Sequence, residues 1–472
     1  MPENDNNHRS ISTTNAQHAQ EALEVVFNEE AEHRRKSSLV PSNNQALDHD
    51  IPHHCIVHSI IEEQRITSPS GFRPDNKPLT KHTDKRPEPV EGREHVHSRL
   101  LTKKELRDMA FGIRELAKRL STLKLKLQVR NIFLLAKAND GNIIKSVREI
   151  AEWLLIKEGS DCKVYVEDTL EHDERFDLKG MLNKYPTVKD RLLFWNSELC
   201  ARYPHTFDIV IALGGDGTVL YASWLFQKIV PPLLAFACGS MGFLTKFDYN
   251  AYQATLSRSF VEGITVSLRL RFEATIMRSQ QGQLPRSRDI VEELIGEESD
   301  DDHTHRPAGS YNILNEVVID RGPNPTMSTL EVFGDDQHFT TVQADGVCVA
   351  TPTGSTAYNL AAGGSLCHPE NPVILLTAIC AHTLSFRPII LPDTIVLRVA
   401  VPFDARAGSW ASFDGRDRVE LHPGDYVTIS ASRYPFPSIL PLDRKQEDWI
   451  DSISRTLHWN SRQRQKPWSQ LS

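Results

Sequence analysis

Apolar residues recur at helical spacing from Leu101 to Leu123 with charged residues between them, which predicts an amphipathic helix. Apolar runs that end in turn residues then alternate with further amphipathic stretches. Strands and helices that alternate in this way form βαβ units, so we predict a doubly wound α/β domain with a parallel sheet over residues 98–262. Ligands of such sheets bind beyond the carboxyl ends of the strands. The apolar runs lie in NIFLLAKAND, CKVYVED, FDIVIALGGDG and PPLLAFACG.

From about residue 263 the pattern changes to short, β-branched segments with alternating apolar and polar positions. This pattern predicts an all-β second domain over residues 263–435. A polar insertion interrupts it over residues 279–310, and we interpret its acidic run, Glu297–Asp302, as a solvated loop rather than a calcium site. A last amphipathic stretch within residues 436–465 predicts a helix that packs back on the first domain.

Residues 1–97 contain no Trp and no Tyr and are rich in Asn, His, Ser, Pro and charged residues. Such a segment cannot bury enough apolar surface to offset its chain entropy, so we predict a disordered polar tail. Its sequence HHCIVH lacks a second ligand pair, and we interpret its histidines as incidental rather than metal-binding. The sequence RRKSSL suggests regulation by phosphorylation near Ser37.

Composition excludes several classes of protein. A net charge of −8 and an isoelectric point near 6.2 argue against nucleic-acid binding, which depends on Lys and Arg. No apolar run is long enough to span a membrane, and the acidic N-terminus resembles neither a secretory nor a mitochondrial leader. The seven cysteines form no CxxC pair, which indicates reduced thiols. We expect a cytoplasmic protein without a membrane or nucleic-acid partner.

A glycine turn, ALGGDGTVL, follows one predicted strand and places Asp216 among glycines. A Rossmann fingerprint would need its third glycine at Leu220, and no Lys-Ser/Thr pair completes a Walker loop. We interpret the turn as a phosphate site in which amides around Gly214, Gly215 and Thr218 bind phosphate oxygens. The Asp216 carboxylate then faces a hydroxyl or Mg²⁺ beside them. The alternative is that Asp216 caps the following helix. A carboxylate in this position can take the proton of an acceptor hydroxyl, so the turn predicts a kinase.

A second stretch, ADGVCVATPTGSTAYNLAAGGSLCHP, spans residues 344–369. A predicted strand runs into hydroxyl-bearing residues and then into a segment of small residues. Hydroxyls and amides can hold the polar edge of a ligand, and small side chains permit its close approach. Alone, the stretch could also cap a helix. Together with the glycine turn, it is interpreted as the other wall of a cleft.

These motifs together resemble those of the ATP-dependent NAD kinases, in the form of the eukaryotic, fungal-type enzymes. The resemblance extends from about Ser98 to the C-terminus. The long threonine-rich motif is very specific, whereas GGDGT is shared with diacylglycerol and sphingosine kinases and nearly with phosphofructokinases. The motifs are GGDG (214–217), Asn315-Glu316, Asp345-Gly346, TPTGSTAYNLAAGG (351–364) and HTLSFRPI (382–389).

The resemblance implies an α/β domain and a β-sandwich with NAD between them. It also implies transfer of the ATP γ-phosphate to the 2′-hydroxyl of the adenosine ribose of NAD, or of NADH. By the same analogy Asp216 is the catalytic proton acceptor, and Mg²⁺ enters with ATP rather than at a metal site of the protein. The NAD-binding residues that it implies are Gly217, Asn315, Glu316, Asp345, Thr356, Ala357, Tyr358 and Ala361.

At two positions, Ala361 and Arg416, the sequence departs from bacterial members of the family. Ala361 takes a position that is often serine there, so it offers no hydroxyl to the ligand. Arg416 follows FDG where bacterial members often carry glutamine, and we interpret it either as a neighbour of phosphate or as half of a surface ion pair.

Two other functions stay open from sequence alone. A lipid kinase with the same GGDGT turn would need a membrane anchor, and no basic amphipathic anchor is found. A noncatalytic NAD-binding regulator would have no use for Asp216. An exposed edge of the sandwich predicts a homo-oligomer.

Overall fold

The computed structural model describes residues 97–136, 140–157, 161–280, 288–295, 304–442 and 448–458. All of these residues belong to one compact unit. Apart from His97, the predicted tail with Ser37 lies outside the described residues, as does the acidic run Glu297–Asp302.

The first sheet is parallel, as the sequence predicts, except for its end strand β7, which pairs antiparallel with β20. Its strand order is β3-β2-β1-β4-β5-β20-β7, with β6 paired to β5. The central strand β4 (Ile209–Gly214) is buried along its whole length and runs parallel to β1 and β5. Its carboxyl end therefore delivers the glycine turn to the edge of the sheet at which ligands bind. The other strands are β1 (Asn131–Ala136), β2 (Lys163–Glu167), β3 (Leu192–Trp195), β5 (Leu233–Ala237), β6 (Phe247–Asp248), β7 (Thr265–Arg269) and β20 (Phe436–Leu440).

Helices cover both faces of this sheet. Successive side chains of a strand point to opposite faces. Ile211 of β4 joins a hydrophobic cluster with Ile150 of α3, whereas Ala212 joins a second cluster with Ala222 of α6. The two clusters make the sheet doubly wound, as predicted. The helices of this part are α3 (Gly141–Ile156), α4 (Leu178–Lys184), α5 (Ser197–Arg202), α6 (Asp216–Leu225) and α7 (Tyr252–Glu262).

Two predicted helices flank these elements in the sequence. α2 (Lys103–Leu120) is the helix expected over Leu101–Leu123, and it begins with a capping box formed by Thr102 and Glu105. α10 (Asp448–Leu457) is the predicted C-terminal helix. Its Trp449 contacts the ring of His368, which follows the threonine-rich motif, at 5.2 Å between centroids.

The all-β part is a sandwich of two antiparallel six-stranded sheets. Their strand orders are β15-β14-β13-β10-β17-β18 and β12-β11-β16-β19-β8-β9. Val317 of β10 and Val427 of β19 come from different sheets and share one hydrophobic cluster, which is the core between them. The strands are β8 (Phe272–Ser279), β9 (His305–Ile313), β10 (Glu316–Asp320), β11 (Ser328–Gly334), β12 (Gln337–Ala344), β13 (Gly346–Ala350), β14 (Val373–Ile379), β15 (Ile389–Pro392), β16 (Leu397–Ala400), β17 (Ser409–Phe413), β18 (Asp417–Leu421) and β19 (Tyr426–Ala431).

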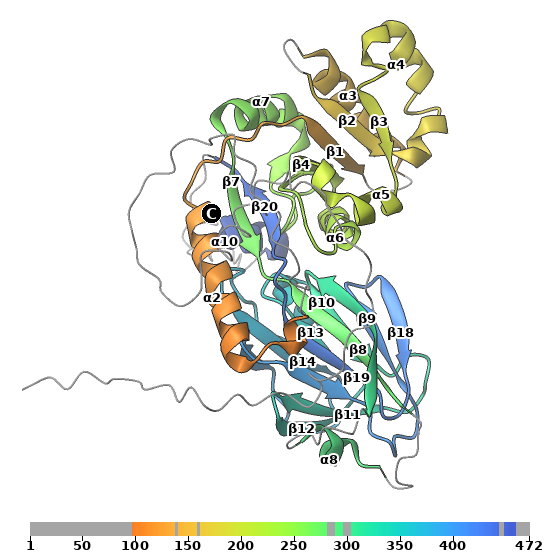
Figure 1. Cartoon of the computed structure of the whole chain (residues 1–472), viewed down its shortest axis with the longest axis vertical. Coiled ribbons are helices and arrows are strands. Elements are labelled where there is room, and N and C mark those ends of the chain that lie inside the picture. Colours follow the sequence, from red (N-terminus) through yellow and green to blue (C-terminus); the bar gives the residue numbers. More distant parts are fainter. Residues whose placement is uncertain are drawn as a thin grey trace, which may run out of the picture. The chain divides into compact units, whose positions relative to one another are not determined.

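The structure differs from the predicted boundaries at two places. We predicted that the residues of β7 belong to the all-β domain and that those of β20 belong to the C-terminal helix, but both strands extend the first sheet instead. Figure 1 shows β7 and β20 side by side, although they are far apart in the sequence. β20 runs parallel to β5 and thereby covers an edge that would otherwise be unpaired. The predicted loop 279–310 contains a short helix, α8 (Ile290–Leu294), and the start of β9. α8 forms because Ile290 and Leu294 lie on one face and are both buried.

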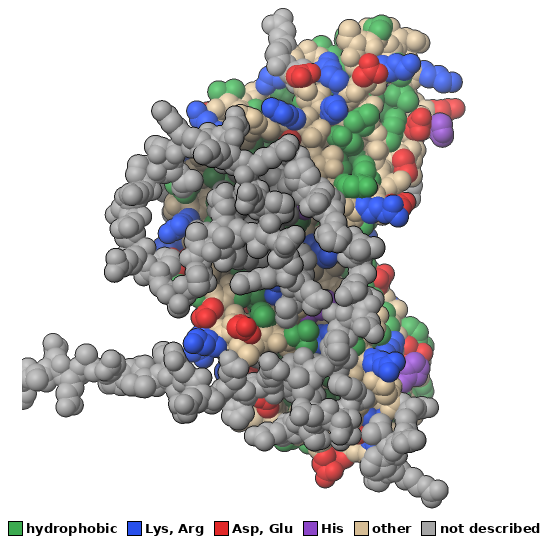
Figure 2. Space-filling model, in the orientation of Figure 1, with side chains coloured by type: hydrophobic (Ala, Val, Ile, Leu, Met, Phe, Trp, Pro, Cys, Tyr) green, Lys and Arg blue, Asp and Glu red, His purple; other side chains and the backbone are tan. Residues whose placement is uncertain are grey.

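None of the described helices combines the length and the hydropathy that crossing a membrane would require. On the described part of the face shown in Figure 2, Lys and Arg side chains are interspersed with Asp and Glu.

Candidate active site

The glycine turn lies between the end of β4 and the start of α6. β4 ends at Gly214, whose φ of 154° favours glycine. Gly215 is the N-cap of α6, and a Cβ on Gly215 or Gly217 would meet nothing within 4 Å. The first amides of α6 can therefore be approached closely, as anion binding at a helix N-terminus requires. Thr218 is buried, and its amide donates to the Gly215 carbonyl at 2.9 Å.

Asp216 is the first residue of α6, and its carboxylate accepts hydrogen bonds from the segment Phe243–Thr245. Oδ2 accepts from the amide of Phe243 at 2.8 Å. Oδ1 accepts from the amide of Leu244 at 3.0 Å and from the amide and hydroxyl of Thr245 at 3.1 and 3.2 Å. Asp216 thus does not cap its own helix. Because Oδ2 has one donor and Oδ1 has three, Oδ2 keeps more capacity to accept from a substrate hydroxyl.

Asn315 and Glu316 lie where β9 ends and β10 begins, and the carboxylate of Asp414 fixes their backbone. Asp414 Oδ1 accepts from the amides of Asn315 at 2.8 Å and Glu316 at 3.1 Å, and Oδ2 accepts from the amide of Leu314 at 2.8 Å. Asp414 is buried in the turn after β17, with a φ of 48°. The sequence analysis missed this residue. The available signal was the FDG turn, because Asp before Gly tolerates the left-handed conformation.

Three buried polar atoms of this region have no hydrogen-bond partner among the described residues: Asn315 Oδ1, Glu316 Oε2 and Thr353 Oγ1. The two segments that carry them adjoin, since the Thr351 amide donates to the Asn315 carbonyl at 2.8 Å. A Cβ on Gly354 would overlap the same carbonyl, so only glycine permits this approach. Buried polar groups are nearly always paired, so an unpaired group of three indicates a place for a ligand.

Glu316 carries a proton at neutral pH. Burial raises the pKa of its carboxyl group to about 8, and the neighbouring Asp414 carboxylate adds to the rise. Burial also raises the pKa of Asp414 to about 6, although its three amide donors and Arg271 oppose this rise. A neutral Glu316 can donate a hydrogen bond to a ligand, whereas an ionised one can only accept.

We expect Glu316→Gln to remove a pH dependence of stability. Folded wild type holds a proton on Glu316 up to about pH 8, whereas the unfolded chain releases it near the ordinary pKa of 4.5. The unfolded state therefore binds fewer protons in this window, and the free energy of unfolding falls as pH rises from about 4.5 to about 8. Glutamine mimics the neutral form and should show no such fall. Denaturant unfolding at about pH 5 and about pH 9 measures the difference, with the exposed Glu171→Gln as control. An equal pH dependence in wild type and Glu316→Gln would contradict the assignment.

Most polar side chains of segment 351–364 also form hydrogen bonds within the fold, and the expectation that its hydroxyls and amides hold a ligand edge stays a prediction. They bond to neighbouring backbone and side-chain atoms rather than projecting as a row. The bonds are Thr351 Oγ1 to the Leu314 carbonyl (2.5 Å), Ser355 Oγ to the Cys367 carbonyl (3.0 Å), Thr356 Oγ1 to the Thr353 carbonyl (3.2 Å) and Thr377 Oγ1 to Asn359 Oδ1 (2.8 Å). Thr353 is the exception, since its hydroxyl has no partner among the described residues.

The end of this segment is accessible. Tyr358 and Ala361 are exposed, and Ala357 is half-buried. Burial raises the pKa of Tyr358, and nearby carboxylates, Asp320 first and Asp345 after it, raise it further. Asp345 is half-buried and pairs with Arg321 at 3.3 Å. Tyr358 and Asp345 therefore lie within electrostatic range of each other.

The turn after β17 contacts both the Asn315-Glu316 pair and helix α6. Asp414 holds Asn315 and Glu316, and two residues later the guanidinium of Arg416 lies 4.4 Å from the ring centre of Tyr221 in α6. Arg416 thus makes a cation–π contact rather than the surface ion pair considered above. The predicted site residues form two sets, Gly214, Gly215, Asp216, Gly217 and Thr218 around the start of α6, and Asn315, Glu316, Asp345, Thr356, Ala357, Tyr358 and Ala361 in or directly after strands of the sandwich.

Comparison with known proteins adds to this geometry. Residues 132–264 match the family model of the ATP-NAD kinase N-terminal domain, and residues 314–440 match that of the C-terminal domain. The chain is 41% identical to an ATP-NADH kinase of Saccharomyces cerevisiae over 77% of its length and 71% of that protein. It is also 41% identical to an NAD(+) kinase of S. cerevisiae, over 77% of its length and 66% of that protein. A crystal structure of yeast NADH kinase complexed with NADH is similar, with a TM-score of 0.56 and 26% identity over 72% of this chain and 90% of that chain.

Proposed function

Because the chain belongs to the ATP-NAD kinase family, we propose that it transfers the γ-phosphate of ATP to the 2′-hydroxyl of the adenosine ribose of NAD or NADH. The observation that carries the proposal is the Asp216 carboxylate, placed at the open N-terminus of α6 with acceptor capacity left on Oδ2. The relatives favour this reaction over a lipid kinase with the same turn and over a noncatalytic NAD-binding regulator.

In the proposed reaction, the amides at the start of α6 bind phosphate oxygens and Asp216 Oδ2 takes the proton of the ribose hydroxyl. The hydroxyl oxygen forms a bond to the γ-phosphorus while the bond to the bridging oxygen breaks, and ADP leaves with that electron pair. Mg²⁺ is proposed to arrive as part of the substrate, bound to the triphosphate.

On the sandwich side, we propose that the unpartnered atoms of Asn315, Glu316 and Thr353 bind NAD. The protonated Glu316 donates a hydrogen bond, while Asn315 Oδ1 accepts one. We also propose that Tyr358 and Ala361, which are both exposed, contact the outer part of the bound NAD.

The test is to incubate the purified chain with MgATP and either NAD or NADH, and to resolve the products by anion exchange and mass spectrometry. NADP or NADPH with stoichiometric ADP is expected. Binding of NAD without ADP release would identify a regulator instead, and phosphorylation of diacylglycerol would identify a lipid kinase. Comparison of the two dinucleotides gives the substrate preference.

We expect Gly242→Ala to lower kcat at least about tenfold. A Cβ on Gly242 would overlap the Asp216 carboxylate, so the side chain must move, and a shift of about 1 Å at a reacting group can cost about 10²-fold. Steady-state kinetics of NADP formation measure the loss. Gly112→Ala in α2 is the matched control, because a Cβ there meets nothing within 4 Å. Unchanged kcat in Gly242→Ala would show that the carboxylate tolerates displacement.

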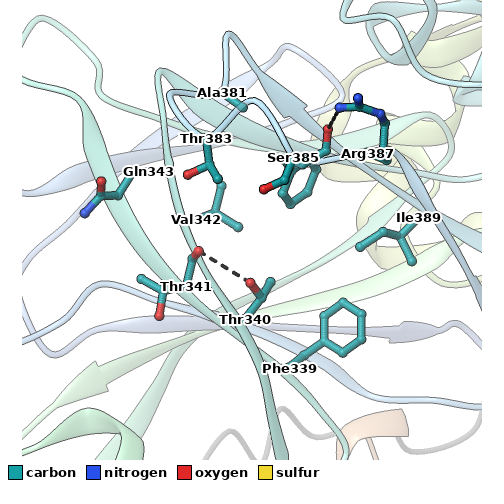
Figure 3. A pocket seen from close by; sticks show the side chains of 11 residues that line it. Phe339, Thr340, Thr341, Val342, Gln343, Ala381, Thr383, Ser385, Arg387 and Ile389 are labelled. Carbon is teal, nitrogen blue, oxygen red and sulfur yellow. Dashed lines mark hydrogen bonds between the residues drawn. The ribbon is translucent and has the colours of Figure 1, made fainter.

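We also propose that the chain forms a homo-oligomer through one side of the sandwich. β12 and β15 are the end strands of their sheets, and a pocket of about 360 Å³ lies between β12 and residues 381–389 (Figure 3). Phe339, Leu384 and Ile390 expose 47%, 88% and 56% of their surface beside it. Free strand edges with exposed apolar side chains favour pairing with a second copy. Analytical ultracentrifugation tests this proposal, which a monomer at micromolar concentration would contradict.

Two further proposals concern location and regulation. The six described cysteines are free thiols, which supports a reducing, cytoplasmic location, and imaging of a tagged chain tests it. Phosphorylation near Ser37, outside the described residues, is tested by phosphopeptide mass spectrometry.

A further inference from the structure

Arg271, directly before β8, is a fully buried cation that the proposed reaction does not use. All of its guanidinium nitrogens donate to oxygen atoms at the C-terminal end of α6 and to one further carbonyl. Burial lowers the pKa of Arg271 to about 9, so the side chain still carries its charge at neutral pH. The acceptors are the carbonyls of Ser223 (3.3 Å), Phe226 (2.9 Å), Gln227 (3.0 Å), Lys228 (3.1 Å) and Tyr434 (2.6 Å), and Ser223 Oγ (3.4 Å).

These contacts fix one end of the helix that carries Asp216 at its other end. The last carbonyls of an α-helix have no partners within the helix, and they carry partial negative charge. A buried guanidinium satisfies several of them in one rigid arrangement, which a flexible ammonium group cannot reproduce. Because α6 spans only Asp216–Leu225, an anchor at its C-terminal end contributes to the position of Asp216 at the other end.

The same anchor is joined to the NAD-binding side. Gln227, next to the end of α6, exchanges two hydrogen bonds with the backbone of Asn312: Oε1 accepts from the amide at 2.7 Å, and Nε2 donates to the carbonyl at 3.3 Å. Asn312 lies in β9, three residues before Asn315. β8, which follows Arg271, pairs with β9 along its length. The end of α6 is thus tied to the strand that leads into Asn315 and Glu316.

We propose that Arg271 is a positioning residue that holds the Asp216 end of α6 in register with the bound NAD, with Gln227 as the second half of the same anchor. This inference rests on the proposed NAD kinase activity and adds a residue to it. Arg271 acts through α6 and touches no substrate. Its loss should therefore reduce the rate of phosphoryl transfer and leave NAD affinity unchanged.

The test is Arg271→Lys, which keeps the charge but has fewer donors and a shorter reach. We expect kcat for NADP formation to fall at least about tenfold, while the Kd for NAD, from isothermal titration calorimetry, stays within about twofold. Arg398→Lys is the matched control. Arg398 is equally buried and also binds carbonyls, those of Leu294 and Asp335, but none in α6. It should lose stability and keep kcat.

A second variant, Gln227→Ala, tests the same proposal in case Arg271→Lys does not fold. Gln227→Ala removes the two bonds to Asn312 and is expected to lower kcat about threefold or more with NAD affinity kept. The proposal is overturned if Arg271→Lys keeps kcat within about twofold of wild type, or if Arg398→Lys loses as much kcat. If Arg271→Lys does not fold, the proposal is overturned when Gln227→Ala has the kcat of wild type. Absence of NADP formation by the wild type would instead refute the proposed function.

Discussion

Asp216→Asn is expected to lower kcat for NADP formation by at least about 10²-fold, the lower end of what a general base contributes. The asparagine amide cannot take a proton from the ribose hydroxyl. Steady-state kinetics with saturating MgATP and NAD measure the loss, and calorimetric titration shows whether NAD still binds.

The contacts of Asp216 explain why asparagine is the informative substitution. Three of its four donors, the Leu244 amide and the amide and hydroxyl of Thr245, bind Oδ1. The carbonyl oxygen of asparagine can keep all three, so only the bond from the Phe243 amide to Oδ2 is lost. An alanine would release the whole segment 242–245 and confuse the loss of the base with the loss of the loop.

Thr245→Val is the matched control for Asp216→Asn. It removes one donor to Oδ1 and leaves the carboxylate in place, so kcat should fall only about threefold or less. A smaller loss in Asp216→Asn than in Thr245→Val would mean that Asp216 serves only to hold the loop. The base would then have to be sought elsewhere.

Elements with an unambiguous period could be predicted from the sequence. α2 has apolar residues at helical spacing, a capping box and charged residues on its other face. The sequence of β14 does not by itself indicate a strand, because PVILLTAI is a continuous apolar run, which periodicity alone cannot assign to a strand or a helix. β20 was missed because its place is set by pairing with β5 and β7, which are remote in the sequence.

In the candidate site, too, local motifs could be predicted from the sequence and long-range contacts could not. The glycine turn and Asn315-Glu316 are short motifs, and their residue types could be read locally. Asp414 binds an amide 100 residues away, and Arg271 binds carbonyls more than 40 residues away. Such long-range partners leave no local pattern. The partners of Asp216 were also hidden, since Gly242–Thr245 reads as an ordinary strand exit until its amides are seen around the carboxylate.

Asp414→Asn is expected to weaken NAD binding at least about tenfold, with a smaller effect on kcat at saturating NAD. The asparagine carbonyl can still accept from the amides of Asn315 and Glu316, but its amino group faces the amide of Leu314. A buried donor without an acceptor costs about 1–3 kcal/mol, which here distorts the strand that carries the NAD contacts. Titration calorimetry of NAD binding measures the loss.

Stability should change less than affinity in Asp414→Asn. Burial raises the pKa of Asp414 to about 6, so the charge itself disfavours the folded state at neutral pH, and asparagine removes that cost. Asp425→Asn is the matched control: Asp425 is buried and accepts from the amides of Ser279 and His422, remote from Asn315. It should lose stability and keep the Kd for NAD.

In wild type, the affinity for NAD should also fall as pH drops below about 6, because protonation of the Asp414 carboxylate weakens its hydrogen bonds with the amides of residues 314–316. Equal NAD affinity in Asp414→Asn and wild type would show that the strand holds its position without this carboxylate.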